Sequence, residues 1–165
     1  MAKLPKLLKA VAGAAGGAGL NVEEVFSIRV HDGSGSSQSI TNGIDLSTEG
    51  GLTWIKKRSG STNHAFFDTE RGGSQLLRLP VTFNQNNAIT SITFNTNGFS
   101  TTDGNDHVNA SSSEYVSFSF RKAENFFDCV TWTGNNSTSR AIAHNLSSTP
   151  GFIIIKCTSD TGDWW

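Results

Sequence analysis

The chain has 165 residues, which is enough for one domain of ordinary size and part of a second. Only 16% of the residues are charged, and the net charge is -1, so we expect no electrostatic attraction to nucleic acid. The 2 cysteines are too few for a disulfide scaffold, and no apolar run reaches the roughly 20 residues that a membrane span needs.

Residues 1–20 form a segment of their own, rich in Lys, Leu, Ala and Gly. At about 100° per residue, a short helix here would carry lysines on one side and an apolar stripe on the other. The stripe consists of Leu4, Leu7, Leu8 and Val11. The glycines of AGAAGGAG weaken a helix and favour a flexible connector. We interpret residues 1–20 as a short amphipathic helix or extended peptide that docks on another protein. A secretory signal, a membrane-surface helix and a leader without a role are the alternatives.

From Val22 onward, short apolar stretches alternate with turn signals, as in an all-β sandwich or barrel. In residues 115–120, Tyr and Ser positions alternate with Val and Phe, which is the period of two of a half-buried strand. No long helix is predicted after the first twenty residues. The stretches predicted as strands are EEVFSIRV, GLTWIKKR, SITFNTNGF, YVSFSFRK, FFDCVTW and GFIIIKC.

The body of the chain is internally repetitive. FSIRVHDG at residues 26–33 is similar to FDCVTWTG at 127–134, and the stretch from Ile40 to Lys57 is similar to that from Ile142 to Cys157. The unit is therefore about 100 residues long. We expect a first β-sandwich unit over residues 21–124 and the start of a second, incomplete unit over 125–165. This arrangement suggests the front part of a longer polypeptide; alternatively, the later strands complete the first unit or pair with a neighbouring chain.

These repeated stretches resemble a repeat found in virion proteins of tailed bacteriophages, especially marine phages. The most specific pieces are WIKKR followed by NHAFFDTERG, and NLSSTPGFIIIK. The resemblance covers about Glu24 to Trp165 and implies concanavalin-like or jelly-roll-like β-sandwich units in tandem, as in tail-fibre-like structural proteins. It carries over no catalytic residue. Family members often continue after the second tryptophan into a charged strand, which leaves the completion of the second unit open.

Candidate chemistry in the sequence is sparse. Residues 102–107, TDGNDH, resemble a calcium loop, but His107 and Val108 stand where the EF-hand pattern needs an oxygen ligand and glycine, so we predict a polar turn. The histidines lack the spacing of a zinc site, and there is no nucleophile elbow. We therefore predict no catalytic residue, no metal and no cofactor. Trp54 is a candidate for stacking on a sugar ring, although such a residue is more often part of a core.

The sequence thus favours a non-enzymatic virion protein, the proximal, tail-attaching part of a tail fibre. The stripe of residues 4–11 would dock on a tail adaptor or nozzle protein, and homotrimers are expected by analogy with fibres. A capsid decoration or head-fibre protein is the first alternative. A carbohydrate-binding module that contacts host polysaccharide and a secreted adhesin are the others.

Overall fold

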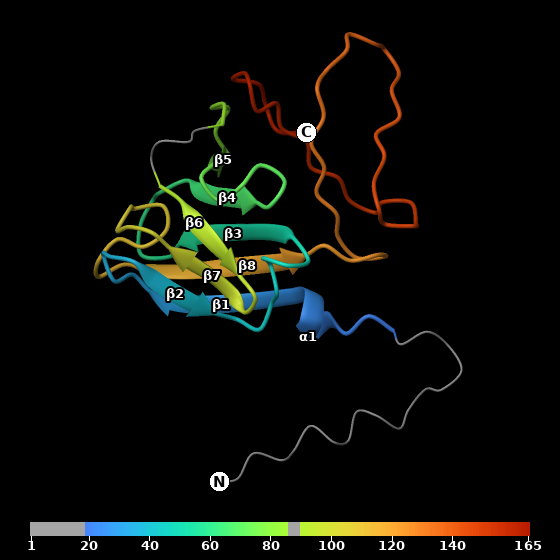
Figure 1. Ribbon diagram of the computed structural model, residues 1–165. Coiled ribbons are helices and arrows are strands. Elements are labelled where there is room, and N and C mark those ends of the chain that lie inside the picture. The colour runs from blue at the N-terminus through green and yellow to red at the C-terminus, as the bar shows by residue number, and fades with distance from the viewer. Residues whose placement is uncertain (1–18, 86–89) are drawn as a thin grey trace.

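The strands of the protein form two antiparallel sheets, as seen in a computed structural model that describes residues 19–85 and 90–165 (Figure 1). Nearly all the regular structure is β, and the only helix in the described residues is one short turn. The elements are α1 (Val22–Val25), β1 (Phe26–Asp32), β2 (Gln38–Thr41), β3 (Gly51–Lys57), β4 (His64–Asp68), β5 (Leu77–Leu79), β6 (Ile92–Asn95), β7 (Gly98–Thr101) and β8 (Glu114–Arg121).

The larger sheet has the order β1-β8-β3-β4-β5, and the smaller has the order β2-β7-β6. Strand β8 lies between β1 and β3 and is antiparallel to both. Its residue Phe118 pairs with Ile28 on one side and with Trp54 on the other. The expected all-β class is confirmed, and both sheets are antiparallel. Strand β8 joins β1 to the other three strands of the larger sheet.

The core lies between the two sheets and takes side chains from both. Tyr115 is its largest fully buried side chain, and its hydroxyl donates to the carbonyl of Asp106 at 3.0 Å and accepts from the N–H of Ala110 at 2.9 Å. Both hydrogen bonds are needed because a buried hydroxyl without partners would be costly. The buried cluster is Ile40, Ile55, Ala65, Phe67, Leu76, Ile92, Phe99, Val108 and Tyr115.

After Tyr115, the side of β8 that faces the smaller sheet carries small polar residues. The opposite, outward side carries the large apolar residues. Ser117 and Ser119 are buried, whereas Phe118 and Phe120 are only half-buried. The inward serines have partners: Ser119 Oγ accepts from Asn42 Nδ2 at 2.8 Å, and Ser117 Oγ donates to the carbonyl of Arg29 at 3.3 Å. The predicted alternation is confirmed, and its larger apolar side faces away from the space between the sheets.

Two of the predicted strands are absent. The stretches at 126–132 and 151–157 have strand-forming sequences, yet residues 122–165 contain only two isolated bridges, Ala123 with Phe127 and Lys156 with Trp164. A strand needs a hydrogen-bonded neighbour, and over most of their length these stretches have none. The prediction of strands at 126–132 and 151–157, which rested on strand propensity alone, is therefore wrong. Figure 1 shows this part of the chain, orange to red, extending beyond the ends of β8 and β4.

Candidate interaction surfaces

The outward face of the larger sheet is a continuous aromatic surface. Trp54 lies 5.1 Å from Phe66 and 4.9 Å from Phe118 between ring centroids, and Phe26 lies 4.9 Å from Phe120. Towards the edge strand β1 this surface opens to solvent, because Ile28 is 57% and Val30 is 58% exposed. Contiguous apolar surface of this kind is typical of contact sites for other proteins.

Trp54, the candidate for sugar stacking, belongs to this aromatic surface. Its indole N–H donates to Nδ1 of His64 at 2.9 Å, and the side chain is half-buried between Phe66 and Phe118. Burial and, secondarily, the charge of Lys56 lower the pKa of His64, which favours the neutral ring that accepts this bond. A sugar could use only the part of the indole that these neighbours leave open, so glycan stacking stays a prediction.

Residues 122–165 contact the larger sheet at two places. Near β8, the Lys122 ammonium lies 2.7 Å from Glu70 and 3.2 Å from Asp128, and the tilted rings of Phe127 and Phe120 lie 5.5 Å apart between centroids. Near β5, the Trp164 indole lies 5.5 Å from Phe66, and its N–H lies 3.2 Å from the carbonyls of Arg78 and Val81. Between these anchors the chain runs through an extended loop.

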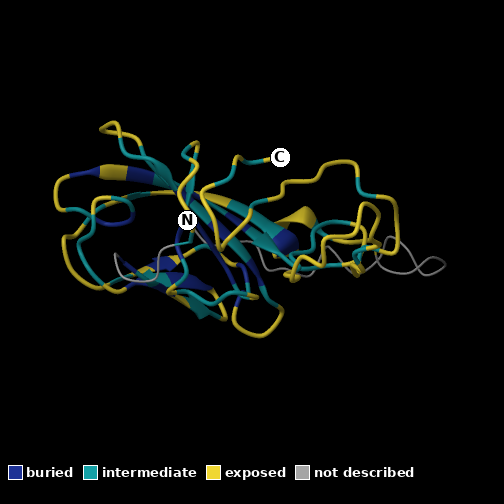
Figure 2. Ribbon diagram, turned by 90° about the horizontal axis from the view of Figure 1, so that it is seen from above, coloured by how far each residue is buried: buried dark blue, intermediate teal, exposed yellow. Residues whose placement is uncertain are grey.

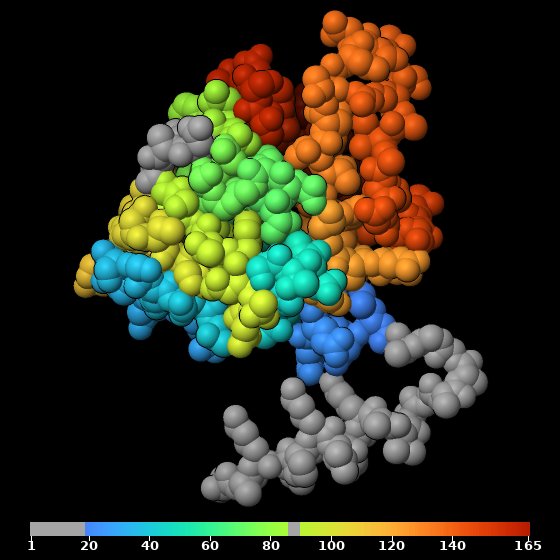
Figure 3. Space-filling model, viewed as in Figure 1, coloured from blue at the N-terminus to red at the C-terminus, as the bar shows by residue number. Residues whose placement is uncertain are grey.

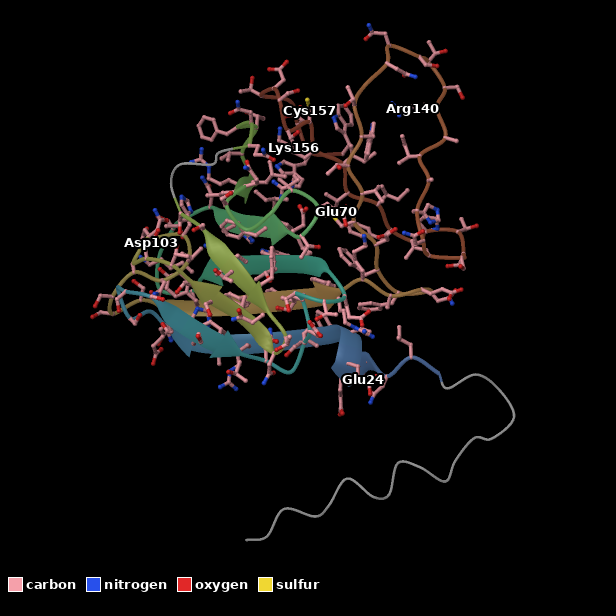
Figure 4. All side chains as sticks on the ribbon, in the orientation of Figure 1. Glu24, Glu70, Asp103, Arg140, Lys156 and Cys157 are labelled. Atoms are coloured by element: carbon pink, nitrogen blue, oxygen red, sulfur yellow. The ribbon has the colours of Figure 1, made fainter. Side chains whose placement is uncertain are left out.

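That loop leaves a run of apolar side chains in solvent. The exposed fractions fall from 79% at Phe152 to 38% at Ile155, with Ile153 and Ile154 between them. The sheets are mostly dark blue and teal in Figure 2, whereas much of the C-terminal segment is yellow. In the space-filling view the orange part of this segment stands beside the main body as a separate arm, whereas its red end lies against the body (Figure 3). Arg140 lies on the outermost loop of the arm (Figure 4). Four consecutive exposed apolar residues are unusual in a protein without a partner at that place.

The C-terminal segment repeats hydrogen bonds of the first unit at the spacing of the sequence repeat. The end of α1 is not repeated: the N–H of Phe26 donates to the carbonyl of Val22, whereas Phe127 and Ala123, 101 residues further on, exchange both backbone hydrogen bonds as an antiparallel bridge. Ile55 pairs with Ala65 in β3 and β4, and Ile155 exchanges two backbone hydrogen bonds of 2.8 and 3.0 Å with Trp165. The start of the hairpin between β3 and β4 is thus present again in the same register.

A turn shared by the two segments supports the same correspondence. The N–H of Ile44 donates to Oδ1 of Asn42 at 3.0 Å, and the N–H of Leu146 lies 3.3 Å from Nδ1 of His144. These two pairs are 102 residues apart, which is the spacing of Ile40 and Ile142. The turn and the start of the hairpin in residues 42–65 therefore have counterparts in the same order in residues 144–165.

The DTERGG stretch forms a buried ion pair rather than a reactive site. Arg71 donates through Nε to Asp68 at 2.6 Å and through its backbone N–H at 2.9 Å, and both side chains are at least nine-tenths buried. Another guanidinium nitrogen donates to the carbonyl of Gln75 at 2.7 Å. Nearby, burial raises the pKa of the Cys129 thiol to about 12, so this cysteine is a poor nucleophile. The geometry fixes the turn after β4.

The suspected calcium loop is used internally. Asp103 Oδ1 accepts from Thr90 Oγ1 and from the N–H of Asn105, both at 2.9 Å, and Asp106 pairs with Lys57. Within the described residues, no group of three His, Cys, Asp or Glu side chains is placed to hold a metal ion. The interpretation of residues 102–107 as a polar turn fits these bonds.

The helix found among residues 19–85 and 90–165 is too short to cross a bilayer.

The docking stripe of Leu4, Leu7, Leu8 and Val11 lies outside the described residues. Sequence reasoning did not identify the aromatic surface or the two anchors of the C-terminal segment. The alternating β8 sequence was the available signal for the aromatic surface, but alternation does not say which side faces the smaller sheet.

A family model described as "Domain of unknown function (DUF7483)" matches residues 22–165, which include both the two sheets and the C-terminal segment. No curated protein and no solved structure matches the chain. Because the match covers most of the sequence, the chain belongs to the DUF7483 family, a domain of unknown function.

Proposed function

We propose that this chain is a non-enzymatic structural protein of a tailed-phage virion and forms the proximal, tail-attaching part of a fibre. The repeated local hydrogen bonding carries the proposal: the Asn42-type turn and the start of the β3–β4 hairpin recur about 100 residues later. Units that follow one another along a chain, each in contact with its nearest neighbours, form an elongated molecule such as a fibre. The proposal that this molecule is part of a phage virion comes from the resemblance of the repeat to phage virion proteins.

In this proposal the units are tandem concanavalin-like or jelly-roll-like sandwiches, and three copies associate around the fibre axis. The open aromatic surface near Ile28 and Val30 offers apolar area for such contacts between copies. Residues 1–20 attach the fibre to a tail adaptor or nozzle protein through the leucine stripe. Several weak attachments on one particle add up to durable binding.

Incorporation into particles tests the attachment. The double variant Leu7→Asp and Leu8→Asp places charges on the stripe and should remove the protein from purified virions, as measured by mass spectrometry of the particles. Ala14→Asp with Ala15→Asp adds the same charge to the connector and should leave incorporation unchanged. Equal incorporation of both variants would refute docking through the stripe.

Cryo-electron microscopy of the particles then tests the location. Three copies sharing one site at the tail are the expected result. Density on the capsid lattice would instead assign the protein to head decoration. Absence from the particle, together with binding on a glycan array that Trp54→Ala abolishes, would favour a carbohydrate-binding module.

A further inference from the structure

Strand β1 is the longest edge strand among the described residues, and its outer edge is open. It has 7 residues, whereas β5, at the opposite edge of the larger sheet, has 3. The edge at β5 is also covered, because the N–H of the Trp164 indole lies 3.2 Å from the carbonyl of Arg78. A long edge strand with free backbone groups is a template for another strand, and proteins usually shorten or cover such edges. Strand β1 is neither short nor covered.

The free backbone groups of β1 belong to the residues that carry its outward apolar side chains. The N–H of Gly33 donates to the carbonyl of Ser113 at 2.7 Å, in continuation of the pairing between β1 and β8. Bonded pairs recur at every second residue of an antiparallel ladder, so the odd-numbered residues of β1 turn their backbone groups to β8. Ile28 and Val30 turn theirs to the open edge. In the described part of the chain, no backbone group forms a hydrogen bond to them from that side.

We infer that β1 pairs edge to edge with β1 of a second copy of this chain, antiparallel and about a two-fold axis at Ile28. The pairing joins the larger sheets of the two copies into one continuous sheet. The inference does not depend on the virion proposal. It uses the edge of the sheet, so the outward face stays open to the contacts between three copies proposed above.

The sequence of β1 suits pairing with itself. Residues 26–30 read FSIRV, so the outward side carries an apolar residue at both ends and at the centre, Ile28. A two-fold axis there puts Phe26 opposite Val30 of the second copy, and Ser27 opposite Arg29. Apolar side chains therefore meet apolar ones, and within this stretch no like charges are opposed. Cross-strand pairs of this kind stabilise a sheet.

The neighbouring registers with the same hydrogen-bonding phase are less favourable. An axis at Arg29 opposes the two copies of that arginine, and like charges directly opposite each other destabilise a sheet. An axis at Val30 puts Ile28 opposite Asp32, which pairs an apolar side chain with a carboxylate. The composition of β1 thus selects both the second copy and the register.

Burial and hydrogen bonding drive the association. Ile28 is 57% and Val30 is 58% exposed, and pairing covers part of this surface together with the rim of the Phe26–Phe120 ring pair. Main-chain hydrogen bonds form between backbone groups that otherwise face solvent, as in other cases of strand addition.

Disulfide trapping tests the register. In a bonded antiparallel pair the opposed Cα atoms lie about 5.5 Å apart, which a disulfide can span. Ile28→Cys in a Cys157→Ser background should therefore form a linked dimer with oxidised glutathione, which takes up the two electrons of the thiols. Val30→Cys is the matched control: it is equally exposed, but its counterpart lies four residues along the second strand, roughly 14 Å away, and should not link. The remaining thiol, Cys129, has a pKa raised by burial to about 12 and reacts poorly.

Amide exchange resolved by residue tests the pairing in the unmodified chain. Raising the protein concentration should slow exchange at Ile28 and Val30 at least about tenfold, because their N–H groups become bonded only in the pair. Arg29, which already bonds to β8, should change little. Ile28→Lys should remove the concentration dependence at Val30. Ile153→Lys, at a residue on the arm that is 60% exposed, should leave it as it is.

Several results would overturn the inference. Equal trapping of Ile28→Cys and Val30→Cys would show that copies meet without a fixed register, and trapping of Val30→Cys alone would place the axis elsewhere. Absence of trapping at Ile28, or exchange at Val30 that does not depend on concentration, would show that β1 does not pair in this way.

Discussion

Trp164 and Trp165 are adjacent in sequence but differ in what they contact, which makes them a matched pair. Trp164 packs on Phe66 and donates to the carbonyls near β5, whereas Trp165 is 80% exposed. Trp164→Ala should release the end of the chain and speed amide exchange at Ile155 by about tenfold, the effect of losing one or two modest interactions. Trp165→Ala keeps its backbone bonds to Ile155 and should change exchange little. Hydrogen exchange measured by mass spectrometry distinguishes them, and equal effects would contradict the anchoring role of Trp164.

His31 should make the stability of the protein fall in mildly acidic solution. Its ring stacks on Tyr115 at 5.5 Å, and burial lowers its pKa below the ordinary value of 6.5. The unfolded chain therefore takes up a proton at a higher pH than the folded chain, so stability is constant above about 6.5 and falls as the pH drops below it. A hydrogen bond from the N–H of Thr48 lowers the pKa of Asp45, and, against the opposing effect of burial, bonds from Asn145 and Lys122 lower the pKa of Asp128. These two carboxylates lose their contribution to stability only below about pH 4.

Urea unfolding midpoints at pH 7.5 and 5.5 measure this dependence. His31→Phe keeps an aromatic ring against Tyr115 and should reduce the difference between the two midpoints. His64, whose pKa burial also lowers, accounts for the part that remains. A difference unchanged by His31→Phe would show that the His31 ring is not the group that titrates.

At the scale of elements, the smaller sheet depends on a glycine at the start of β7. Gly98 has φ of 119°, and a Cβ there would lie 2.1 Å from the carbonyl oxygen of Ile40 on β2. Gly43 also has a positive φ, 88°, but no atom lies within 4 Å of a Cβ at that position. Gly43→Ala should cost about 1–2 kcal/mol for the backbone conformation alone. Gly98→Ala should cost more, because β2 and β7 must also separate, and equal losses in urea unfolding would contradict this.

The elements also show how far sequence reasoning reaches. Strands β1, β3 and β8 were predictable because each carries several apolar or β-branched residues in a row or in alternation. Strand β2 has one apolar residue and β5 has only 3 residues, so neither gave a signal. Which side of β8 faces inward was not predictable, since Ser117 and Ser119 are bonded to partners 88 and 77 residues away in the chain, respectively. The segments at 126–132 and 151–157 carry equally strong patterns and lack neighbouring strands, so their patterns alone could not tell them from β1 and β3.

The whole molecule combines one cooperatively packed body with an arm whose contacts are few. The two sheets share one core, while residues 130–155 lie largely in solvent. Proteases cut where the backbone can open locally at little cost in free energy. The arm should therefore be digested while the sheets are still folded.

Thermolysin, which cleaves before large apolar residues, tests this difference. The first cuts C-terminal to β8 should fall before residues 152–155, where the side chains are exposed and the backbone is mostly unpaired, and a product that retains residues 22–121 should persist. Ile28 and Val30 serve as an internal control, because they are as exposed as Ile153 but lie in a strand paired with β8. Intact masses followed over time give the order of the cuts. Cleavage within β1 as fast as within 152–155 would show that side-chain exposure, rather than strand pairing, controls digestion, and that the arm is no less stable than the sheets.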